Sequence, residues 1–144
     1  KIDFNSILKS CTGPNVVGYN VITELIKLIH FNDKLPQYQN VYITDRNREK
    51  YMIWDDQWVL GDNNVFKQVI GKPQELLMNY DDEIKTGVKN KNSTAKKIND
   101  TLDKYYDFNG FQDVVDPKVK DLLYNNREKI KNNFKRSNMI LKII

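Results

Sequence analysis

The 144-residue chain contains one cysteine, one histidine and one alanine. A lone cysteine cannot form an internal disulfide, and Cys11 together with His30 provides too few ligands for the usual zinc sites. We therefore expect no metal, no cofactor and a reducing compartment. The chain has no run of about 20 uninterrupted apolar residues, and Lys142 interrupts the apolar segment at the C-terminus. The sequence predicts no membrane-spanning helix and no membrane partner.

Motifs for phosphate binding and catalysis are also lacking. Gly71-Lys72 has no glycine five positions earlier and is followed by Pro73, which has no N–H, so a P-loop is excluded. The acidic pairs Asp55-Asp56 and Asp81-Asp82 consist of neighbours whose side chains usually point apart, which makes a metal-dependent nuclease the weakest of the functions considered. His30 ends an apolar helical segment, where a structural histidine is more common than a catalytic base. We expect the protein not to be an enzyme.

Lysine and asparagine dominate instead, with 19 and 18 positions, followed by 14 isoleucines. This skew is typical of an adenine- and thymine-rich coding sequence. The net charge of +4 is unevenly spread. Residues 1–84 carry 9 Lys/Arg against 12 Asp/Glu, a net charge of −3, whereas residues 85–144 carry 14 against 7, a net charge of +7. Any surface for an anionic partner is therefore expected in the second half.

The length predicts a single domain over residues 1–144, with a helix and β-meander in residues 1–61 and helices in residues 62–144. Because the chain begins at Lys1 without an initiator methionine, we expect it to be a fragment of a longer protein. A short helix is predicted around Phe4 to Leu8. Apolar residues at three- and four-residue spacings predict an amphipathic helix from about Val21 to Asn32.

Three segments rich in β-branched and aromatic residues predict an antiparallel meander, at residues 40–44, 50–54 and 57–60. If Asp55-Asp56 forms a two-residue hairpin loop, Ile53 lies opposite Trp58, and Trp54 lies on the other face. Both faces of this sheet are then partly apolar. Either helices cover both faces, or one face is a recognition surface.

Helical patterns follow to the end of the chain. Asp62 is a predicted N-cap, and Gly71 to Pro73 is predicted to end that helix. A seven-residue apolar repeat from Leu77 to Tyr105 fits a helical hairpin or one long helix equally well. The last helix is predicted to start with Asp116 as its cap and Pro117 at its first position. The fold class is therefore α+β: an amphipathic helix packed on a small three-stranded antiparallel meander, followed by a helical C-terminal half.

Two sets of side chains are candidates for nucleic-acid contact. Trp54 lies in the aromatic part of the predicted sheet, where it would either stack on a base or pack in the core. The basic residues of the second half would either contact phosphates or remain a solvated helix face. The basic candidates are Lys96, Lys97, Lys120, Arg127, Lys131 and Lys135. Because lysine outnumbers arginine 19 to 4, contact independent of base sequence is expected.

Four segments carry a resemblance to a known family. They are Leu28-Ile-His-Phe-Asn32, Pro36 with Asn40-Val-Tyr-Ile-Thr44, Lys50-Tyr-Met-Ile-Trp-Asp-Asp-Gln-Trp58, and Leu122-Leu-Tyr-Asn-Asn-Arg127. Over roughly residues 15–135 the chain resembles the C-terminal domain of an uncharacterised family encoded by nucleocytoplasmic giant DNA viruses. In that family the domain often follows a zinc finger and a coiled coil, and no catalytic residues carry over. This chain shows no zinc-finger cysteines, so any such finger would lie upstream of Lys1.

The resemblance implies a viral protein located in the infected host-cell cytoplasm, at the viral factory, or in the virion, and it agrees with the Asn/Lys/Ile skew. Together with the residue patterns, it predicts a non-enzymatic viral binding module that contacts DNA or RNA mainly through basic helices, with Trp54 stacking on a base. The alternative is a protein–protein interaction module of a viral assembly, with Leu77 to Tyr105 as its contact face and self-association through the helices. The sequence does not choose between them.

Overall fold

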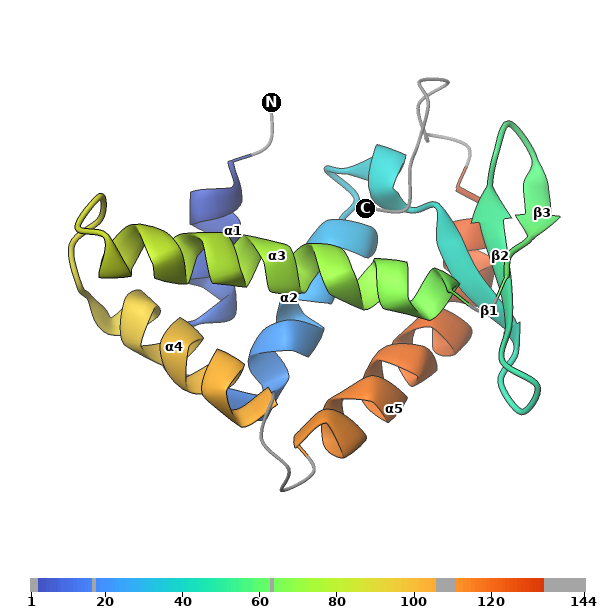
Figure 1. The fold of residues 1–144 in the computed structure, drawn as a ribbon. Coiled ribbons are helices and arrows are strands. Elements are labelled where there is room, and N and C mark those ends of the chain that lie inside the picture. The colour runs from blue at the N-terminus through green and yellow to red at the C-terminus, as the bar shows by residue number, and fades with distance from the viewer. Residues whose placement is uncertain (1–2, 17, 63, 106–110, 134–144) are drawn as a thin grey trace.

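The computed structural model describes residues 3–16, 18–62, 64–105 and 111–133 (Figure 1). These residues form the predicted α+β fold, with a small antiparallel sheet at one end and a helical second half. Their elements in chain order are α1 (Phe4–Cys11), η1 (Gly18–Asn20), α2 (Val21–His30), η2 (Pro36–Tyr38), β1 (Val41–Asp45), β2 (Lys50–Trp54), β3 (Trp58–Leu60), α3 (Val65–Lys85), α4 (Ser93–Tyr105), α5 (Phe111–Asn125) and α6 (Arg127–Lys131). None of the helices in these ranges has the length and apolarity needed to cross a membrane.

The predicted meander is confirmed, with strand order β1-β2-β3, but its hairpin register differs by one residue from the expected one. Trp54 pairs with Trp58, so the β2–β3 loop contains three residues, Asp55 to Gln57, rather than two. Asp56 adopts the left-handed conformation with φ of 59°, which Asp tolerates better than most residues. The expected pairing of Ile53 with Trp58 is therefore wrong, and both tryptophans lie on the same face.

The opposite face of the sheet belongs to the core. Val41, Ile43 and Tyr51 are buried there, in one cluster with apolar residues of α2, α3 and α5. In β2 the side chains alternate between the two faces, so Tyr51 points to the core and its neighbours Lys50 and Met52 point away from it. Helices α5 and α6 pack against β1, at the edge of the sheet.

Helix α3 runs without interruption through Gly71 and Pro73, so the expected break there is wrong. Pro73 has no N–H for the carbonyl of Val69, a loss that normally disfavours a helix interior. Its ring is buried, however, and extends an apolar stripe that packs the helix along its length on the core; this stripe contains Val65, Val69, Ile70, Pro73, Leu77 and Tyr80. Burial of the stripe outweighs the local penalty. Asp62 does not cap α3, because its Oδ1 accepts the N–H of Asn64 in the preceding turn.

The segment from Leu77 to Tyr105 forms a helical hairpin of α3 and α4, with Gly87 in its turn at φ of 79°. Its apolar repeat faces inward: Leu77, Ala95, Ile98, Leu102 and Tyr105 are buried in the chain's own core. These side chains are therefore not the exposed contact face expected for a protein partner. Two apolar members of the repeat near the turn differ: Ile84 is half-buried, and Val88 has 73% of its surface exposed.

Helix α5 also differs from expectation, because Asp116 and Pro117 lie inside it rather than at its start. Asp116 accepts a hydrogen bond from the Tyr105 hydroxyl at 2.8 Å, which joins α5 to α4. Val115 and Val119 are fully buried beside it and bind the first turns of α5 to the core. The expected final helix is divided at Asn126 into α5 and α6. Phe134, expected in its apolar stripe, lies outside the described residues.

Candidate nucleic-acid interface

The face of the sheet that points away from the core carries a connected set of rings. Trp58 contacts Tyr42 edge to face, with ring centroids 4.7 Å apart and planes at 72°. Trp54 meets Trp58 in the same way, at 5.4 Å and 73°. Tyr42 is buried, whereas both tryptophans are partly exposed. We call this surface, formed by Tyr42, Trp54, Trp58, Met52 and Leu60, the aromatic face.

Two lysines border the aromatic face. The indole N–H of Trp58 donates to the backbone carbonyl of Lys131 at 3.3 Å, which brings the end of α6 against the rings. Lys50 begins β2 and points to the same side as Trp54, since residues 50, 52 and 54 alternate with Tyr51, which is buried, and Ile53, which is half-buried. Both lysines are exposed, and neither has an ion-pair partner among the described residues. Lys50 is absent from the predicted set, although strand alternation alone would have identified it.

Two predicted basic residues are engaged within the chain. The Lys120 ammonium lies 3.0 Å from Glu49 Oε1 and 4.8 Å from the centre of the Phe66 ring. The Arg127 guanidinium lies 4.0 Å from the centre of the Tyr124 ring, and it also donates to the Tyr124 carbonyl at 2.8 Å. These contacts connect α5 and α6 to their surroundings and occupy both cations.

Lys96 and Lys97 lie on α4, at the opposite end of the molecule from the sheet (Figure 1). The 21-residue helix α3 separates the two ends by about 30 Å, at 1.5 Å per residue. Lys97 donates to the Gly13 carbonyl at 2.7 Å, whereas Lys96 is exposed. Lys135 lies outside the described residues. Of the predicted residues that are described, Trp54 lies on the sheet and the backbone of Lys131 adjoins its neighbour Trp58, whereas the others lie elsewhere or are engaged.

His30 and Cys11 are buried structural groups. His30 is completely buried at the end of α2, and its Nδ1 lies 2.8 Å from the carbonyl oxygen of Tyr38. Burial lowers the pKa of His30 to about 4, partly opposed by that hydrogen bond. Burial also raises the pKa of the Cys11 thiol to about 12, which keeps it protonated at neutral pH. Both side chains are withdrawn from solvent and stabilise the core.

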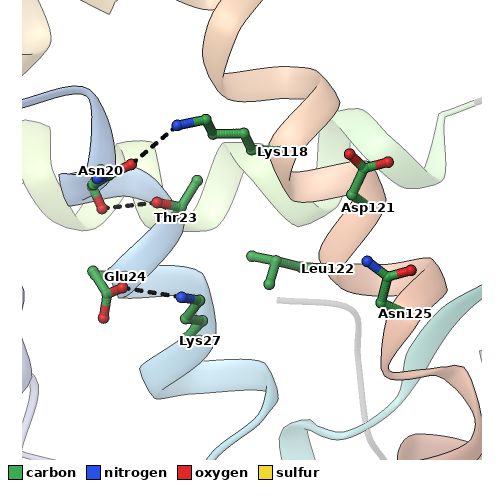
Figure 2. Close-up of a pocket in the computed structure, with 8 residues that line it drawn as sticks. All are labelled: Asn20, Thr23, Glu24, Lys27, Lys118, Asp121, Leu122 and Asn125. Carbon is green, nitrogen blue, oxygen red and sulfur yellow. Dashed lines mark hydrogen bonds and ion pairs between the residues drawn. The ribbon is translucent and has the colours of Figure 1, made fainter.

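A groove between α2 and α5 shows how surface charges pair locally (Figure 2). It has a volume of about 300 Å³ and carries both signs of charge. Lys27 lies 3.1 Å from Glu24, and Lys118 donates to the Asn20 side chain at 3.4 Å. This balance gives the groove no clear preference for an anion. Within the described ranges, no three His, Cys, Asp or Glu side chains gather in a way that would hold a metal ion.

Searches against protein-family models, curated proteins and solved structures found no match for this chain. The viral origin and location implied by the sequence resemblance therefore stay predictions. Among the described residues, the aromatic face with the two lysines beside it is the arrangement best suited to bind a ligand.

Proposed function

We propose that the protein is a non-enzymatic module that binds single-stranded nucleic acid on the aromatic face of the sheet. A base stacks on Trp54, and the flanking phosphates contact Lys50 and Lys131. The observation that carries this proposal is the partly exposed Trp54, whose ring is held edge to face against Trp58. An exposed lysine, Lys50, lies on the same strand, and another, Lys131, lies at the end of α6 beside Trp58. A role in an infected cell rests on the sequence resemblance alone.

The geometry of Trp54 suits a stacking platform. Its strand position is fixed by the pairing with Trp58, and its ring is supported by the edge-to-face contact, so little side-chain entropy is lost when a base binds. Stacking of a base on an aromatic side chain contributes about 1–3 kcal/mol in single-strand binders. Because every base has a π-face, this contact favours single strands without selecting a base sequence.

The lysines support the same conclusion. An ammonium is a point charge that meets a phosphate without the bidentate geometry by which arginine recognises guanine. Two phosphate contacts on a single strand predict that the logarithm of the affinity falls with the logarithm of the salt concentration with a slope of about −1.4. A basic surface extending over α4, α5 and α6 would have a much steeper slope. Salt dependence thus distinguishes the aromatic face from the basic helices.

The test is titration of labelled oligo-dT and oligo-U, at about 50 and 200 mM salt. We expect Trp54→Leu, which keeps an apolar side chain but removes the ring, to weaken binding about 5- to 150-fold, and Trp54→Phe to weaken it less. Lys131→Ala and Lys50→Ala should each reduce the salt slope. Lys67→Ala, at an exposed lysine of α3, is the matched control and should change neither quantity. Absence of binding by the wild type at low salt would rule the function out.

Assembly with another protein is the second candidate, because Leu60 on the aromatic face has 66% of its surface exposed beside Met52, its register partner. Exposed apolar side chains that adjoin one another are typical of protein interfaces. Light scattering can examine self-association. Leu60→Lys should dissociate an assembly that uses this face, whereas Val88→Lys, at an equally exposed position in the α3–α4 connection, should not. A monomeric wild type at all concentrations would exclude self-assembly.

A further inference from the structure

We propose that the pocket between α3 and α4 is a separate binding site for a mononucleotide, either free or at the phosphorylated end of a strand. Its base would rest on the apolar floor, and its phosphate would meet Lys91 and Lys96. This site lies at the end of α3 that is remote from the sheet, and the inference does not depend on the aromatic face.

The pocket opens within the helical hairpin and has a volume of about 520 Å³, within the range of small-molecule sites. Ile84 on α3 and Ala95 on α4 provide an apolar lining. Lys91, from the connection before α4, and Lys96, on its first turns, also line it. The pocket thus combines a surface for a flat ring with two cations.

The charges of the lining residues do not cancel. Asp81 is only 8% exposed, and its carboxylate is compensated by Lys85 Nζ at 2.8 Å and by the Asn99 amide at 3.2 Å. Lys91 and Lys96, in contrast, have no carboxylate within 4 Å among the described residues. Two lysines without a carboxylate partner thus line the same pocket, and their charges favour an anionic ligand there.

The polar groups of the wall indicate the class of ligand. The Asp81 carboxylate can accept a hydrogen bond from the exocyclic amino group of adenine or cytosine, and the Asn99 amide can both donate and accept. A bare phosphate would leave the apolar floor uncovered. A fatty acid would meet the lysines but would place hydrocarbon against Asp81 and Asn99. A nucleotide matches the floor, the polar wall and the two cations together.

Calorimetric titration tests this at low salt, with AMP and CMP as ligands and with adenosine and inorganic phosphate as partial ligands. We expect AMP and CMP to bind at least tenfold more tightly than either partial ligand. The double variant Lys91→Ala/Lys96→Ala should weaken nucleotide binding at least tenfold, and because both side chains are exposed, the fold should persist. Lys67→Ala should bind as the wild type does.

Two further arms identify the source of the nucleotide and separate this site from the sheet. A short oligonucleotide with a 5′-phosphate should compete with AMP if the pocket accepts the end of a strand. The oligonucleotide should not compete if the pocket accepts only the free nucleotide. Both results support the site. Trp54→Leu should leave AMP binding unchanged even if it abolishes strand binding. Equal AMP affinity in the wild type and the double variant, no heat of binding, or phosphate binding as tightly as AMP would overturn the inference.

Discussion

At the scale of single residues, burial determines how His30 affects stability. The Tyr38 carbonyl can only accept a hydrogen bond, so the neutral imidazole of His30 carries its proton on Nδ1 and donates it at 2.8 Å. Its Nε2 is buried and has no partner among the described residues. Protonation would therefore place a second N–H and a full charge in the core without compensation, which is why burial lowers the pKa of His30 to about 4.

This shift predicts an acid-sensitive fold. The unfolded chain binds the proton near the ordinary pKa of 6.5, whereas the folded chain binds it near a pKa of about 4. The contribution of His30 to the free energy of unfolding is therefore fully present above pH 6.5 and is lost as the pH falls toward 4. The loss attributable to His30 is about 1.4 kcal/mol per pH unit in this window. Urea unfolding at pH 7, 6 and 5 measures it. His30→Asn, whose amide can still donate to Tyr38 but does not titrate, should show a flatter profile; an equally steep one would contradict the assignment.

The candidate interface illustrates what single residues reveal from sequence alone. Trp54 was identifiable because aromatic residues crowd the predicted strands, and Lys50 follows from strand alternation. The contact of Trp58 with Lys131 joins positions 73 residues apart, and no local pattern encodes it. In the same way, the engagement of Lys120 by Glu49 depends on the packing of α5 beside the sheet. Charge patterns located basic residues, but only the fold shows which of them remain available.

At the scale of elements, regular apolar spacing predicted the helices and strands, and the errors fell where tertiary packing overrides local signals. The expected break at Gly71 to Pro73 does not occur, because the buried stripe continues on both sides of it. Asp116 and Pro117 resemble a helix start, yet Asp116 is bound by Tyr105 from α4. The hairpin register differs because the β2–β3 loop has three residues, and its middle residue, Asp56, takes a left-handed conformation. The pattern of apolar residues does not reveal the length of this loop.

Gly71 within α3 and Gly61 before it should show opposite changes in stability when each is replaced by alanine. A Cβ on Gly71, inside the helix, would meet no atom within 4 Å apart from the adjoining backbone of its own helix, so Gly71→Ala should stabilise the protein by about 0.5–1 kcal/mol through helix propensity. A Cβ on Gly61 would lie 2.5 Å from Val65 Cγ2, so Gly61→Ala should destabilise it by about 1–3 kcal/mol. Midpoints of urea unfolding compare the two variants. Equal effects would show that the sheet does not approach the start of α3 as closely as described.

At the scale of the whole molecule, one core joins the acidic first half to the basic second half. The buried cluster includes Ile26 of α2, Ile43 of β1, Leu77 of α3, Ile98 of α4 and Leu123 of α5. Helix α3 contributes to this core along its length; its first residue, Val65, lies beside Gly61 at the end of the sheet, and its last turns line the pocket proposed for a nucleotide. The two proposed sites are thus held at a fixed separation, and each can be changed without altering the other.

A shared core predicts that the sheet and the helices unfold together. The two tryptophans lie on the sheet, so their fluorescence reports its unfolding, whereas far-UV circular dichroism reports mainly the helices. We expect both signals to give one midpoint in urea, because a chain of this length with a continuous core unfolds cooperatively. Leu77→Ala, at a fully buried position, should lower the free energy of unfolding by about 2–5 kcal/mol and shift both midpoints equally, while Met78→Ala, at the exposed neighbouring position, should have a small effect. Separate midpoints, or a shift confined to the dichroism, would mean that residues 1–61 fold independently of the helical half.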